Sequence, residues 1–103
     1  MISYGMKYTE IREHVKMPPP AAPPLTSAQI RAARALIRWS AEDLAHHSAV
    51  SVTTIRRAEL MPSTTALTRA NDQAIRRALE NAGVEFIDAD QGGPGVRLRA
   101  PPN

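Results

Sequence analysis

The stretch Arg34–Glu59, RALIRWSAEDLAHHSAVSVTTIRRAE, contains two short helical patterns joined by a tight connection at Ser48–Val50. Ser40 stands just before the first pattern, with Asp43 three residues on. In this arrangement the hydroxyl can cap free amides while the acid favours the helix start. Ser51 stands in the same place before the second pattern. The spacing predicts two helices that meet at a short turn.

The side chains of these two predicted helices divide into an inner and an outer face. Apolar residues fall where two crossing helices would bury them, at Leu44, Ala45, Val50, Ile55 and Ala58. The outer face of the second helix carries small polar side chains and two arginines, which suit contact with base edges and phosphates in a major groove. This arrangement is typical of a helix-turn-helix that reads DNA with residues 51–60. The side chains expected to contact or position DNA are Arg38, Ser40, Ser51, Val52, Thr53, Thr54, Arg56 and Arg57.

Many positions of the stretch match one family pattern in a single register without gaps. The matching residues are Arg34, Ile37, Trp39, Ser40, Leu44, Ala45, Ser48, Val50, Ser51, Thr54, Ile55 and Glu59. On these residues the segment from about Leu25 to Ala82 resembles the Xre family, the helix-turn-helix type of phage repressors and Cro proteins. The resemblance implies a mainly α, lambda-repressor-like bundle of four to five helices whose third helix reads DNA. It also implies an internal ion pair between Arg34 and Glu59, which would clamp the first helix to the end of the third.

The chain departs from the family pattern at three positions. Arg38 stands where the family has a glycine before the tryptophan, and Ala49 replaces the glycine of the turn. An alanine near the left-handed region costs about 1 kcal/mol, which a fold can absorb. Ala41 replaces the glutamine that in the family often touches the DNA backbone. We therefore expect the same fold with altered DNA contacts, among which Arg38 would supply a cation.

Composition indicates one small domain with an anionic partner. The chain has 103 residues, of which 43% are apolar, and a formal net charge of +3. All ten basic residues after Leu25 are arginines, which suit bidentate contact with guanine and phosphate but are also common as solvated surface residues. There is no cysteine, which excludes disulfides and thiolate sites and fits a reducing cytoplasm. No apolar run of the sequence is long enough for a membrane span.

The first 24 residues differ in composition from the rest of the chain. Five prolines between Pro18 and Pro24 favour an extended, solvated strut, so residues 1–24 are expected to form a flexible arm. Alternatives are an arm that reaches DNA or a partner, or a start codon chosen too far upstream of Met6 or Met17. The expected organisation is completed by the helix-turn-helix domain at residues 25–83, a hairpin at residues 84–99 and a tail at residues 100–103.

Helical periodicity also surrounds the central stretch. A first helix should begin at Thr26 or Ser27 and bury Ile30, Ala33, Leu36 and Ile37. Trp39 is expected to pack under the bundle.

A last helix should run through residues 67–82, with Gly83 as its C-terminal stop. Alternatively, Asn71 and Asp72 could cap a shorter helix after a separate turn. The sequence leaves both possibilities open.

Alternation of apolar and polar residues in Val84–Asp88 and Val96–Arg99 predicts a β-hairpin around a glycine-proline loop. Its inward residues are expected to be Val84, Phe86, Val96 and Leu98. Because a lone hairpin is marginal in water, it should lie on the helices or pair with a second copy. We assign these four side chains to dimerisation, the alternative being that they close the bundle of a monomer.

The sequence offers little support for catalysis. His46 and His47 are adjacent, so their side chains point about 100° apart on a helix and favour an exposed helix end over a metal site. The glycine-rich segment Gly92–Gly95 lacks the lysine and helix that follow a phosphate-binding loop. No cofactor or metal is expected, and an enzyme is not predicted.

Two classes of function fit these observations. The first is a sequence-specific DNA-binding regulator, a homodimeric repressor that reads an inverted repeat in double-stranded DNA. The second is a protein-interaction module, an antitoxin or adaptor that keeps the fold with weak or no DNA binding. The polar outer face of the second predicted helix of the motif favours the first class, and the alanine at position 41 favours the second. An antitoxin that represses its own operon would satisfy both.

Overall fold

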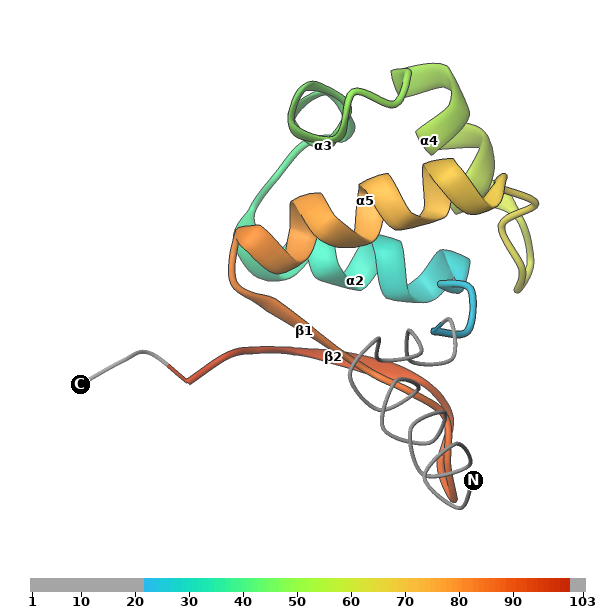
Figure 1. The fold of residues 1–103 in the computed structure, drawn as a ribbon, viewed down its shortest axis with the longest axis vertical. Coiled ribbons are helices and arrows are strands. Elements are labelled where there is room, and N and C mark those ends of the chain that lie inside the picture. Colours follow the sequence, from blue (N-terminus) through green and yellow to red (C-terminus); the bar gives the residue numbers. More distant parts are fainter. Residues whose placement is uncertain (1–21, 101–103) are drawn as a thin grey trace, which may run out of the picture.

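The computed structural model describes residues 22–100, which form four helices followed by a two-stranded antiparallel hairpin (Figure 1). The elements are α2 (Ser27–Ile37), α3 (Ala41–Ser48), α4 (Val52–Leu60), α5 (Arg69–Asn81), β1 (Val84–Ile87) and β2 (Gly95–Leu98). The predicted mainly helical class with a C-terminal hairpin is confirmed. Of the expected N-terminal arm, only residues 22–24 lie within the described part, and they are exposed and form no regular element.

Each helix begins at a hydroxyl side chain that accepts a hydrogen bond from a backbone amide of the first turn. Thr26, Ser40 and Ser51 do so for α2, α3 and α4, and the first two form full capping boxes. Thr68 does the same for α5. The sequence pattern did not single out Thr68, and the alternative start at Asn71 and Asp72 is wrong.

Asp72 has a different role from the predicted cap. Its side chain is buried in α5, and its Oδ1 accepts a hydrogen bond from the backbone N–H of Leu25 at 2.9 Å. A buried carboxylate is tolerated when it accepts such a bond. Asp72 therefore joins α5 to the chain just before α2.

Helices α2 and α3 both end at a residue in the left-handed region. The φ angles are 58° at Arg38 and 59° at Ala49, the positions where the family pattern has glycine. Gly83 follows α5 with a φ of 108°. The left-handed turn expected at Ala49 is thus present, and the chain makes it without glycine.

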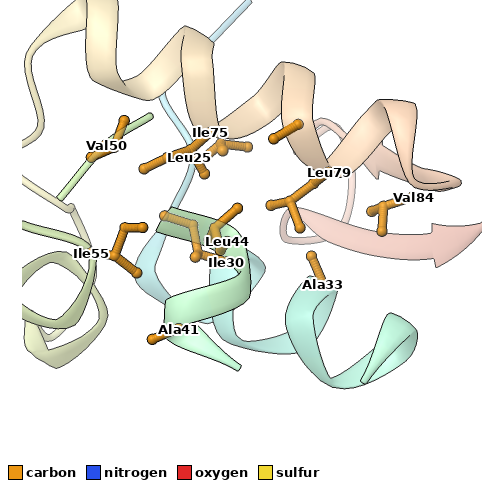
Figure 2. Close-up of a cluster of buried hydrophobic side chains, with 11 residues drawn as sticks. Leu25, Ile30, Ala33, Ala41, Leu44, Val50, Ile55, Ile75, Leu79 and Val84 are labelled. Carbon is orange, nitrogen blue, oxygen red and sulfur yellow. The ribbon is translucent and has the colours of Figure 1, made fainter. Parts of the chain in front are cut away.

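The core fills the space among the four helices and the first strand (Figure 2). Its largest fully buried apolar side chains are Leu25, Ile30, Leu44, Ile55, Ile75, Leu79 and Val84. Ile37, Trp39 and Ala45 are only partly buried against it. Leu36 was predicted to face inward but is 40% exposed. Ile30 and Ala33 define the buried face of α2, and Leu36 lies beside that face rather than on it.

The hairpin packs on α2 and α5, with Val84 opposite Leu98 and Phe86 opposite Val96. Val84 is fully buried, while Phe86 and Val96 pack half-buried on the core. The prediction that Leu98 points inward is wrong, because this side chain is 50% exposed. The hairpin therefore uses most of its apolar face on its own helices, and Val84 is not available to a second copy.

Gln29 fixes the hairpin to α2. Its side chain is 5% exposed, and its Nε2 donates to the carbonyl oxygens of Ile87 at 3.3 Å and Gly95 at 3.1 Å. Its Oε1 accepts the backbone N–H of Thr26 at 2.9 Å. One buried amide thus caps α2 and holds both strands where they enter the loop, which satisfies its polar atoms.

Candidate nucleic-acid interface

The outer face of α4 is polar and open to solvent, while its inner face is apolar and buried. Thr53, Arg56 and Arg57 are exposed, whereas Ile55 and Ala58 are buried. Among the other predicted DNA-contacting residues, Ser51 is exposed and Val52 and Thr54 are half-buried. The amphipathic pattern seen in the sequence therefore corresponds to the orientation of α4 in the fold.

The hydroxyl groups at the start of α4 bind each other. Ser51 Oγ accepts the backbone N–H of Thr54 at 3.1 Å and donates to Thr54 Oγ1 at 2.8 Å. These bonds fix both side chains at the helix entrance. Thr53, which lies between them in the sequence, is exposed.

A buried ion pair holds the far end of α4. Arg34 Nε and Nη2 donate to the two carboxylate oxygens of Glu59, each at 2.7 Å, and Arg34 Nη1 donates to the carbonyl oxygen of Trp39 at 2.9 Å. The side chain of Arg34 is 21% exposed and that of Glu59 is 8% exposed. The hydrogen bond to Glu59 is the main cause that raises the pKa of Arg34. The ion pair implied by the family resemblance is therefore present, with bidentate geometry.

Two further contacts attach the last turn of α4 to α2. Arg31 Nη1 donates to the carbonyl oxygen of Glu59 at 2.6 Å, and Ser27 Oγ donates to that of Ala58 at 2.8 Å. Carbonyls at a helix C-terminus lack partners within the helix, so these contacts satisfy groups that would otherwise need water. The orientation of α4 is thus set by charged and polar contacts at its C-terminal end.

Arg56 and Arg57 are neighbours on the same helix but have different surroundings. Arg56 Nη2 donates to Glu42 Oε2 of α3, and the two side chains are 54% and 62% exposed. Arg57 has no ion pair or side-chain hydrogen bond within residues 22–100. Glu42 was not among the site residues predicted from the sequence. Its place in the first turn of α3, a short distance along the chain from α4, was a signal that could have indicated it.

The first turn of α3 is acidic and satisfied by its own side chains. Ser40 Oγ accepts the N–H of Asp43 at 2.9 Å, and Asp43 Oδ2 accepts the N–H of Ser40 at 2.9 Å. This backbone bond is the main cause that lowers the pKa of Asp43. A hydrogen bond from its own backbone and then the contact with Arg56 lower the pKa of Glu42. Two carboxylates therefore occupy a helix N-terminus whose dipole would otherwise favour a phosphate.

The remaining predicted cation and the histidines lie beside this motif. Arg38 is exposed at the end of α2, and in the described part of the chain no hydrogen bond or ion pair joins it to α4. Trp39 stacks on His47 with ring centroids 4.4 Å apart, and His46 meets His47 edge-on at 5.3 Å. Both histidines are exposed, as expected for the end of α3.

Two hollows mark the surface near α5. One, of about 310 Å³, lies between α4 and the start of α5 and is lined by Arg57, Thr65, Thr68 and Asn71 among others. The other, of about 470 Å³, is lined by Pro24, Leu67, Arg69, Asp72 and Arg76 among others. The carboxylate of Asp72 already accepts the Leu25 N–H. Within residues 22–100 no three histidine, aspartate or glutamate side chains gather as metal ligands would.

Comparison with protein-family models and with curated proteins finds no match to this chain. None of the helices in the described residues has the length and apolar character needed to cross a membrane.

Proposed function

We propose that this protein is a sequence-specific DNA-binding transcriptional regulator of the Xre type, with a lambda-repressor-like domain that reads DNA through α4. The observation that carries the proposal is the exposed polar face of a helix whose other end is bound to α2 by a bidentate ion pair. Thr53, Arg56 and Arg57 are exposed on α4, while the Arg34–Glu59 pair fixes its orientation. A reading helix must be held rigidly for its side chains to select bases.

In this proposal α4 lies in a major groove and α3 crosses the phosphate backbone. Arg57, which has no ion pair within residues 22–100, is the cation best suited to bind guanine O6 and N7 with two donors. Thr53 can contact a base edge or a thymine methyl group, and the half-buried Val52 adds apolar contact at the start of the helix. Arg38 contributes a phosphate contact that positions the protein without reading sequence. Such a regulator acts in the cytoplasm, where the DNA is.

The experiment that tests the proposal is DNA binding by the Arg57→Ala variant, with Arg77→Ala as the matched control. Arg77 is an exposed arginine of α5, so its removal changes net charge equally without altering α4. Against DNA from upstream of its own gene, Arg57→Ala should lose about 1–3 kcal/mol of specific binding and relax preference at one base pair. Arg77→Ala should have a smaller effect that is the same for all sequences. Equal binding by wild type and Arg57→Ala would refute the assignment of α4 as the reading helix.

We further propose that the regulator binds as a homodimer on an inverted repeat, with the hairpin at or near the two-fold axis. Of the four residues assigned to dimerisation, Leu98 is the most exposed, so it is the side chain best placed to meet a second copy. A dimer would set two reading helices about 34 Å apart, the length of one DNA turn. Leu98→Asp should convert the dimer to a monomer in sedimentation, while the packing of α5 against β1 stays unchanged. A wild-type protein that sediments as a monomer at micromolar concentration would refute this interface.

The second candidate function is a protein-interaction module, such as an antitoxin or adaptor that binds DNA weakly. The acidic first turn of α3 favours it, because Glu42 and Asp43 stand where the DNA backbone would pass. A salt titration separates the two functions. A regulator should bind its upstream DNA tightly, with a steep fall in affinity as salt rises, whereas an interaction module should bind that DNA weakly or not at all even at low salt.

A further inference from the structure

The two arginines of the α4 outer face differ in whether their charge is already neutralised. Arg56 is bound to Glu42 across the turn, while Arg57 has no such partner among residues 22–100. Both members of the Arg56–Glu42 pair are more than half exposed. An exposed pair of this kind stabilises a fold by at most about 1 kcal/mol, so its main effect is on the charge of the surface it occupies.

A carboxylate on a DNA-facing surface acts on binding in two ways. It competes with phosphate for the guanidinium beside it, and it repels the phosphates that approach it. Glu42 belongs to α3, the helix that in the proposed function crosses the DNA backbone. Asp43 adds a second negative charge in the same turn. Glu42 therefore neutralises one cation of the α4 outer face and leaves a negative charge near the DNA backbone.

We propose that Glu42 is an affinity-limiting and specificity-determining residue: it holds Arg56 away from DNA phosphates, so that Arg57 carries the readout. This inference rests on the proposed function, because it assigns different roles in DNA binding to the two arginines of the α4 outer face. Affinity that comes from phosphates is the same for every sequence, while affinity from a base edge is not. A face in which one arginine is neutralised and its neighbour is free therefore favours specific over non-specific binding.

The test compares Glu42→Gln with Glu85→Gln, a control with the same change of charge at a side chain that is 43% exposed, against 62% for Glu42. Glu85 forms an exposed ion pair with Arg97 on the hairpin, so the control breaks an equivalent pair away from α4. Arg56→Gln and the Glu42→Gln/Arg56→Gln double variant complete the cycle. Binding is measured at several salt concentrations on two duplexes, one from upstream of its own gene and one of mixed sequence.

Glu42→Gln should raise affinity for the mixed-sequence duplex about two- to fivefold, the range that the strength of an exposed pair allows. It should also steepen the dependence of affinity on salt by about one counterion. Glu85→Gln should do neither. Arg56→Gln should weaken binding to both duplexes alike, because it leaves the Glu42 carboxylate unpaired, and it should abolish the gain when Glu42 is already replaced.

Several results would overturn the inference. Weaker specific binding by Glu42→Gln would show that Glu42 instead orients Arg56 toward a base. An equal gain in Glu85→Gln would reduce the effect to net charge. A wild-type protein that binds specifically, combined with an unchanged Glu42→Gln variant, would refute the inference and leave the proposed function intact. No DNA binding by either protein would refute both.

A measurement without DNA tests the contact itself. Carbon NMR of the glutamate carboxyl groups follows the titration of Glu42 in the full chain. In the wild type the contact with Arg56 contributes to a lowered pKa, so Arg56→Gln should move the midpoint upward. Arg57→Gln should leave the midpoint where it is. Identical shifts in the two variants would show that Arg56 holds no special position beside Glu42, and the inference would fall.

Discussion

The junction between α2 and α4 and the junction between α3 and α4 both contain an arginine–glutamate pair, but the surroundings of the two pairs differ. At the first junction, Arg34 binds both oxygens of a Glu59 side chain that is 8% exposed. At the second, Arg56 reaches one oxygen of Glu42, and both side chains are more than half exposed. The difference in burial decides what each pair does, because water screens the exposed pair much more than the largely buried one.

The buried junction holds the fold together, while the exposed junction sets the properties of a surface. Removing one partner of a buried pair leaves the other partner's charge unpaired in the protein interior, where water solvates it poorly. Removing one partner of an exposed pair leaves a charge in water. Helix α4 is thus held by the ion pair at the end that packs on α2, while the exposed pair changes the charge of its face beside α3.

The largest effect is expected from Glu59→Ala at the buried junction. The variant strands Arg34 and should lower the free energy of unfolding by about 3–5 kcal/mol. Since a domain of this size has only about 5–15 kcal/mol in total, much of its stability would be lost. Urea unfolding followed by circular dichroism measures the change, with Glu85→Ala as the exposed control. If both variants unfold at the same urea concentration, burial does not distinguish the two kinds of pair.

A second buried junction of α2, the one with the hairpin, should give the next largest effect. Gln29→Ala removes the donor to the carbonyl oxygens of Ile87 and Gly95. The loss of these buried hydrogen bonds should cost about 1–3 kcal/mol. Hydrogen exchange should speed up first in β1 and β2, with the helices less affected. The exposed Gln73 of α5 supplies the control, and uniform loss of protection over the whole chain would contradict a local role for Gln29.

The sequence predicted local features of the fold more completely than it predicted contacts between distant residues. The caps at Ser40 and Ser51 depend on residues three positions away, so a local pattern was enough to find them. Helical periodicity predicted which residues lie at the centre of each buried face, but not which residues lie at the boundary of that face. Leu36 and Ile37 are adjacent and point about 100° apart, so both cannot lie at the centre of one face.

Contacts between distant parts of the chain were predicted only where a family pattern specified them. The Arg34–Glu59 pair was expected from the resemblance, whereas the bonds made by Gln29 and Asp72 were not. Each of these polar side chains meets a backbone group 47 or more residues away. Such partners depend on how the helices pack, which no local spacing records. The Glu42–Arg56 contact spans only 14 residues, and the place of Glu42 in the first turn of α3 was a signal that could have indicated it.

At the exposed junction, the backbone of the turn also affects stability. Ala49 has a φ of 59°, where glycine has no steric penalty. Ala49→Gly should therefore raise the free energy of unfolding, by up to about 1 kcal/mol. Ala35→Gly, at an exposed helical position of α2, should lower stability by a similar amount. If Ala49→Gly instead lowers the thermal unfolding temperature, the entropy that glycine adds to the unfolded chain outweighs the backbone strain that it relieves.

The smallest effect is expected from Asp43, whose carboxylate is fully exposed beside the same turn. The N–H of Ser40 holds the pKa of this carboxyl below its usual range. Because the folded-state pKa is the lower one, the charged carboxylate stabilises the fold above the unfolded-state pKa of about 3.9, and this contribution is lost as pH falls through the folded value. Asp43→Asn should thus melt at a lower temperature than the wild type at pH 7, and the gap should close as the solution is acidified below about pH 4. Asp88→Asn, with the same change of charge in the hairpin loop, tests for a general charge effect. A gap for Asp43→Asn that stays constant down to pH 2 would mean that its carboxylate does not support the start of α3.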